Sequence, residues 1–125
     1  MKLNRKEFDK AVRMAYKRIP AEIRGRMENV VITVKKRPSR EMLKEMGYSP
    51  DEPLLGLYDG TSLKEHSFFS TPPFHPDTIF IFQEPMEEMC ESLAELEREI
   101  EITVVHEVAH FLGISEERLE ALGYG

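Results

Sequence analysis

The sequence predicts a single α+β domain, and three observations carry this prediction. The chain has 125 residues, enough for one domain with its own core and too few for two ordinary ones. Apolar residues recur at helical spacing near both ends of the chain. Between them lie short runs of β-branched and apolar residues typical of strands, and neither a repeat nor a low-complexity linker divides the chain.

The first helix is expected over residues 4–19. Asn4 is a candidate N-cap, and Glu7 completes a capping box with it. Apolar residues then follow on one helical face until Pro20, which ends the helix. Alternating β-branched residues predict a strand over residues 29–36.

Shorter elements fill the middle of the chain. Ser39 can cap a helix that runs to residue 46, with Gly47 at its C-terminal end. A short strand is expected over residues 54–58, and the pair Asp59-Gly60 is a turn signal.

An irregular segment is expected next, over residues 61–77, because it combines Ser and Thr with three prolines. A loop of this length in a small domain is usually functional or mobile. An apolar strand follows over residues 78–82, and Pro85 suits the first position of a short helix.

A long helix is expected from a second capping box, formed by Ser92 and Glu95, to Leu112. The β-branched stretch 102–105 would also suit a strand, but the capping box and the helical spacing of the apolar residues favour a helix. Gly113 can end this helix.

The net charge of −6 is unevenly distributed along the chain. Residues 1–50 carry 14 Lys and Arg against 6 Asp and Glu, whereas residues 51–125 carry 3 against 17. A basic half can bind nucleic acid, but here the basic residues are spread out and lack interleaved aromatics. We therefore expect the two halves to attract each other or to form separate solvated faces, and a nucleic-acid partner is disfavoured.

The composition predicts a soluble protein of the cytoplasm. No apolar stretch approaches the roughly 20 residues that span a bilayer, and the first residues lack the apolar region of a secretory signal. The single Cys90 excludes an internal disulfide and a cysteine-rich zinc module.

The chemistry is concentrated in the sequence His106-Glu107-Val-Ala-His110. Two histidines four residues apart lie on one face of a helix and can bind one zinc ion, each at about 2 Å. Glu107 lies one position round the helix, where it can take a proton from water that zinc has acidified towards a pKa of about 7. The structural alternative is a pair of histidines packed in the core, each satisfied by a carbonyl.

A catalytic zinc site needs a third protein ligand. Gly113 permits the left-handed turn that would bring the chain back towards the metal, and Glu116 follows three residues later. The alternative role of Glu116 is a charge in the first turn of a last helix, over residues 116–122, that Ser115 caps. Glu117 and Glu120 are weaker candidates for the third ligand.

These residues carry a resemblance to the minimal zincin family, a group of small bacterial metallopeptidase-like proteins. The motif H-E-x-x-H-x-x-G-x-x-acid resembles the metzincin arrangement of metallopeptidases in particular. The matching stretches together span most of residues 29–125. They are residues 54–58 (LLGLY), 77–82 (DTIFIF), 102–110 (ITVVHEVAH) and 111–119 (FLGISEERL).

The resemblance implies a truncated zincin-like fold. A small mixed sheet of three to four strands would pack against an N-terminal helix and the long motif helix. The resemblance also implies an edge strand over residues 54–59, where an extended peptide could pair and contact Leu57 and Tyr58.

The resemblance further implies zinc held by His106, His110 and Glu116, with Glu107 as general base. Glu116 is a departure, since the family more often has Asp at this position. Full metzincins also continue to a Met-turn and a C-terminal subdomain that shapes the substrate pocket, whereas this sequence ends nine residues after Glu116.

Three functions follow from these observations. The first is a zinc-dependent metalloendopeptidase that acts on a peptide or protein segment. The second is a zinc-binding module without turnover. The third is a zinc-dependent ribonuclease-like hydrolase, whose His-x3-His-x5-His spacing matches positions 106, 110 and 116 but has His in place of Glu116.

Two further groups of side chains have minor candidate roles. The loop residues His66 and His75 could approach the metal but are better explained as surface histidines. Tyr48, Tyr58 and Tyr124 could each supply a hydroxyl to an oxyanion.

Overall fold

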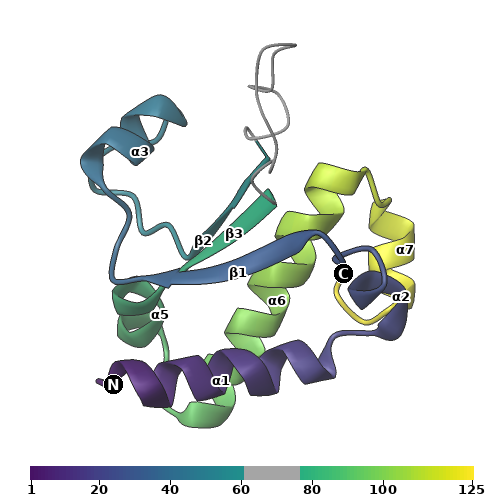
Figure 1. The fold of residues 1–125 in the computed structure, drawn as a ribbon, viewed down its shortest axis with the longest axis horizontal. Coiled ribbons are helices and arrows are strands. Elements are labelled where there is room, and N and C mark those ends of the chain that lie inside the picture. Colours follow the sequence, from purple (N-terminus) through teal and green to yellow (C-terminus); the bar gives the residue numbers. More distant parts are fainter. Residues whose placement is uncertain (61–76) are drawn as a thin grey trace.

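The computed structural model describes residues 1–60 and 77–125. In these ranges it has six helices and a three-stranded sheet, which confirms the α+β class and the small mixed sheet (Figure 1). The predicted irregular segment lies outside the described residues except for Asp77, which already belongs to a strand. None of the helices in the described ranges is long and apolar enough to cross a lipid bilayer.

The sheet has the strand order β1-β3-β2. Strand β1 (Val30–Lys35) runs parallel to β3 (Asp77–Phe82) in the centre, and β2 (Gly56–Asp59) runs antiparallel to β3. The register pairs Ile32 with Ile79 and Tyr58 with Ile79. Strand β2 is therefore an edge strand, as the resemblance implied, although it begins two residues later than the sequence predicts.

The N-terminal helix α1 (Arg5–Arg18) packs against the long helix α6 (Leu93–Leu112). Its predicted capping box is present, since Asn4 accepts a hydrogen bond from the Glu7 amide and Glu7 accepts one from the Asn4 amide. Figure 1 places α1 alongside β1, with α6 crossing both. The shared core is fully buried and contains Phe8, Ala15, Ile79, Ile81, Leu96, Ile100 and Val105.

Two short helices differ from the sequence-based expectation. Helix α2 (Ala21–Arg24) directly after Pro20 was not predicted, because a single turn has too few residues to display a helical period. Helix α5 (Gln83–Met89) begins two residues before Pro85. Proline is tolerated there because the amides of the first turn have no partner within the helix.

The remaining helices follow the expected positions. Helix α3 (Arg40–Glu45) is capped by Ser39, and it stands on the far side of β2 from the main helices (Figure 1). Helix α7 (Glu116–Ala121) is capped by Ser115. The β-branched stretch 102–105 lies within α6, so the helical interpretation is confirmed.

Ion pairs join the two halves of the chain. Arg18 pairs with Glu97 and Arg37 with Glu84 and Glu88, as expected for attraction between a basic and an acidic half. Arg118 of the acidic half pairs with Glu22 of the basic half in the opposite sense.

Candidate functional site

Helix α6 carries the motif at its C-terminal end. Ser92 caps its first turn by accepting a hydrogen bond from the Glu95 amide at 3.1 Å. The second half of the predicted capping box differs, because Glu95 accepts from the Glu91 amide and not from Ser92. At the other end Gly113 adopts φ 70°, the left-handed conformation that glycine reaches without strain. The helix ends there, directly after the motif.

The two histidines lie on the exposed surface of α6. His106 and His110 are both exposed, while Val108 and Ala109 between them and Val105 before them are buried. The helix therefore presents two imidazoles one turn apart to the outside. The alternative of two histidines packed in the core does not fit this placement.

His106 is held by the main chain of the C-terminal turn. Its Nε2 atom lies 2.9 Å from the carbonyl oxygen of Tyr124. A carbonyl can only accept a hydrogen bond, so this contact places a proton on Nε2. A metal ion would bind His106 through Nδ1 while this hydrogen bond lasts, or through Nε2 once it is released.

Tyr124 is itself fixed by a buried network. The residue is 6% exposed, its hydroxyl donates a hydrogen bond to the Glu101 carboxylate, and Arg98 pairs with the same carboxylate at 3.0 Å. Burial, followed by the contact with Glu101, raises the pKa of Tyr124 to about 12. This hydroxyl is therefore committed to Glu101 and does not serve an oxyanion.

Glu107 is held from the opposite side by the sheet. Its Oε1 atom accepts a hydrogen bond from the Tyr58 amide of β2 at 2.9 Å. A charge-assisted bond to a main-chain amide fixes the carboxylate strongly. One carboxylate oxygen thus lies at the edge strand, on the same helical turn as the exposed histidines.

Tyr58 connects Glu107 with the edge of the sheet. Its ring stacks on Phe111 with centroids 4.1 Å apart, and its hydroxyl donates to Asp77 at 2.6 Å. Burial, followed by the contact with Asp77, raises the pKa of Tyr58 above its ordinary value. Its hydroxyl is thus engaged like that of Tyr124, while Tyr48 forms no such contact within the described residues.

The acidic candidates for a third ligand lie on α7. Glu116 and Glu117 occupy its first turn and Glu120 its last, and all three side chains are exposed. Among residues 1–60 and 77–125, no three His, Cys, Asp or Glu side chains converge into a set that could hold a metal ion. The structure thus places His106, Glu107 and His110 together near the C-terminal end of α6. It does not bring Glu116 to them, so the role of Glu116 as a zinc ligand stays a prediction.

The donor chemistry fits zinc in part. Two exposed imidazoles four residues apart are a suitable pair of ligands, and neutral imidazole is a preferred zinc donor. A third protein donor has to come from a rearrangement of the α7 side chains or from another group. The histidines at positions 66 and 75 lie outside the described residues.

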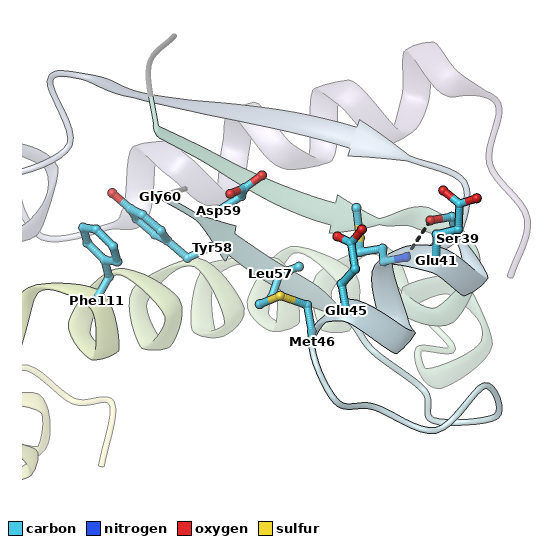
Figure 2. Close-up of a pocket in the computed structure, with 10 residues that line it drawn as sticks. Ser39, Glu41, Glu45, Met46, Leu57, Tyr58, Asp59, Gly60 and Phe111 are labelled. Carbon is cyan, nitrogen blue, oxygen red and sulfur yellow. Dashed lines mark hydrogen bonds between the residues drawn. The ribbon is translucent and has the colours of Figure 1, made fainter. Parts of the chain in front are cut away.

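A groove of about 390 Å³ lies along the edge strand, and Tyr58, whose amide holds Glu107, is one of its lining residues. Leu57 and Tyr58, which the resemblance implied as substrate contacts, both line it, and Phe111 closes one end (Figure 2). The opposite wall comes from α3, through residues that the sequence interpretation missed. They are Ser39, Glu41, Met42, Glu45 and Met46.

The comparisons with known proteins identify the family of the chain. Residues 27–125, most of the chain, match the family described as zincin-like metallopeptidase. The comparison with curated proteins found no match. The family match begins at residue 27, shortly after α2, and includes the whole sheet, the groove and the motif helix. The chain therefore belongs to the zincin-like metallopeptidase family, as the motif on α6 had indicated.

Proposed function

We propose that this protein is a zinc-dependent peptide-bond hydrolase in which Glu107 is the general base. The observation that carries the proposal is the position of Glu107. Its carboxylate is fixed by the Tyr58 amide at 2.9 Å, beside two exposed histidines and at the edge of a sheet where a peptide can pair. Membership of the zincin-like family supports zinc as the cofactor.

His106, His110 and an acidic side chain of α7, with Glu116 as the first candidate, would hold the zinc. A bound zinc ion supplies Lewis acidity, which polarises a scissile carbonyl and lowers the pKa of water to about 7. Glu107 accepts the proton of the attacking water and returns it to the leaving amine.

The edge strand has the complementary task of aligning the substrate. An extended peptide beside β2 would use main-chain hydrogen bonds for affinity, while Leu57 and Tyr58 contact its side chains. The Tyr58 amide already holds Glu107, so one residue links the base to the peptide-aligning edge.

A zinc-binding module without turnover is the second candidate function. It would use the same two exposed imidazoles, His106 and His110, as the first zinc ligands. The two functions differ in a single measurable property, which is hydrolysis by the zinc-loaded protein.

The test compares the wild type with Glu107→Gln on a mixture of fluorogenic peptides, with the zinc content of each protein measured in parallel. We expect Glu107→Gln to retain zinc and the amide contact of Tyr58, because the Gln carbonyl can still accept, and to lose hydrolysis. Glu28→Gln, an exposed change far along the chain from the motif, is the control. Hydrolysis that persists in Glu107→Gln would contradict the assigned role, and a zinc-loaded wild type that cleaves nothing would favour the binding module.

The third ligand is tested by Glu116→Ala, Glu117→Ala and Glu120→Ala. We expect Glu116→Ala to cause the largest loss of zinc affinity, measured by competition with a fluorescent chelator. A larger loss in either of the other two variants would move the assignment along α7.

A further inference from the structure

We infer that the groove between α3 and β2 selects peptides with a lysine or arginine side chain, and this inference rests on the proposed function. It names the class of residue that the groove receives when a peptide pairs with the edge strand. Three features of the groove support it: its walls, its charge and its connection to Glu107 through Tyr58.

The walls suit a long unbranched side chain. Met46, directly after α3, faces Leu57 of β2, and Phe111 of α6 lies at the end near Tyr58 (Figure 2). Met42 of α3 also lines the groove. Met46 is 46% exposed and Phe111 is 42% exposed, so both offer apolar surface that an occupant would cover. Methionine side chains are flexible and adapt to an aliphatic stem.

The acidic charge of the groove comes from Glu41 and Glu45 of α3 and from Asp59 at the end of β2. Glu41 and Glu45 are four residues apart and both line the groove, whereas Arg40 and Lys44 of the same helix do not. No lysine or arginine is among the lining residues in the part of the chain that the structure describes. The helix thus directs its acidic side chains to the groove and keeps its basic ones away from it.

The acidic pair is uncompensated. Within the described ranges neither Glu41 nor Glu45 takes part in an ion pair. Like charges four residues apart on a helix repel each other, so a cation between them relieves that repulsion. A lysine or arginine matches both features, since its stem covers the apolar walls while its charged end reaches the two carboxylates.

The volume and position agree with one such side chain on a bound peptide. A space of about 390 Å³ lies at the lower end of the size of small-molecule pockets. It is lined by Leu57 and Tyr58 of the edge strand, and the Tyr58 amide holds Glu107. A side chain in the groove would therefore belong to a residue close to the bond that Glu107 acts on.

The test measures binding to the full-length Glu107→Gln protein, so that turnover plays no part. The probes are two fluorescein-labelled peptides, Ala-Gly-Ala-Lys-Ala-Gly-Ala and the same peptide with norleucine in place of Lys. Norleucine has the same aliphatic stem without the charge. Fluorescence anisotropy at low salt gives both dissociation constants.

We expect the Lys peptide to bind about tenfold more tightly than the norleucine peptide, a gain that two partly exposed ion pairs can supply. The preference should fall to less than twofold in Glu41→Gln/Glu45→Gln and in high salt. It should persist in Glu28→Gln/Glu91→Gln, a double variant with the same change of net charge at exposed positions outside the groove.

Equal affinities for the two peptides, no binding of either, or a preference that survives in Glu41→Gln/Glu45→Gln would overturn the inference. A preference lost equally in the control variant would also overturn it, because the effect would then come from the net charge. Failure of the proposed function appears separately, as a wild-type protein that cleaves neither peptide, and leaves this binding result intact.

Discussion

The two parts of helix α6 differ in what they present to the rest of the molecule. From residue 93 to 105 the helix alternates between an exposed side and a deeply buried one, on which Leu96, Ile100 and Val104 are at most 1% exposed. From residue 106 to 112 the exposed side carries His106 and His110. One continuous helix thus contains a buried half, residues 93–105, and a motif half, residues 106–112, which carries the candidate zinc ligands.

The comparison explains how a small domain can hold a reactive surface in place. The buried half packs against α1 and the sheet, so the helix axis is fixed by the core. Two main-chain groups then hold side chains of the motif half. The Tyr58 amide donates a hydrogen bond to Glu107, and the Tyr124 carbonyl accepts one from His106. Neither contact depends on an exposed side chain as its partner, so both survive most surface substitutions.

The largest expected effect separates the two halves directly. Ile100→Ala removes a fully buried side chain and should lower the free energy of unfolding by about 2–5 kcal/mol. His110→Ala in the exposed half should change it by less than about 0.5 kcal/mol in the absence of metal. Urea denaturation of both metal-free variants measures the two free energies of unfolding. Equal decreases would show that the motif half contributes to stability as much as the buried half does.

An intermediate effect is expected where the buried half supports the C-terminal turn. Tyr124→Phe removes the hydroxyl that donates a hydrogen bond to Glu101. It should lower the free energy of unfolding by about 1–3 kcal/mol at neutral pH. The pKa of Tyr124 is raised to about 12, against about 10 in the unfolded chain. A raised pKa stabilises the fold fully below pH 10, and this contribution is lost as the pH rises towards 12.

The corresponding measurement follows the stability difference between wild type and Tyr124→Phe from pH 8 to pH 11.5. The difference should shrink steadily above pH 10. A difference that stays constant across this range would contradict the buried hydrogen bond.

The smallest expected effect concerns the end of the motif half. Gly113 adopts φ 70°, so Gly113→Ala should lower the free energy of unfolding by about 1 kcal/mol. Gly113→Asn should lower it by less, because Asn tolerates the left-handed conformation better than Ala. Thermal unfolding of the three proteins gives the order. Equal melting temperatures for the Ala and Asn variants would argue against a conformational origin.

The sequence predicts the helices and their ends well, because these signals are local. Caps at Asn4, Ser39 and Ser115, the stop at Gly113 and the helical spacing of apolar residues each depend on a few neighbours in the chain. Even the β-branched stretch 102–105 could be assigned, since helical spacing outweighed strand propensity. The motif residues themselves were also evident from their spacing alone.

What surrounds the motif could not be predicted, because it depends on where distant segments meet. Nothing in the sequence near Tyr124 indicates that its carbonyl lies at His106, and nothing near α3 indicates that Met46 faces Leu57 across a groove. The position of the Glu116 side chain relative to the two histidines likewise depends on the path of the chain after Gly113. Such contacts follow from tertiary packing, which local patterns do not encode.

The account depends most on the claim that the exposed half of α6 binds zinc. The direct measurement is the zinc content of the untagged protein by mass spectrometry, after purification without chelators and after titration with zinc. His110→Ala is the test variant, and Glu28→Gln, an exposed change outside the motif and the groove, is the control. About one zinc per chain in the wild type and the control, with little in His110→Ala, is the result the account predicts. A wild-type protein that neither contains zinc nor takes it up would contradict it.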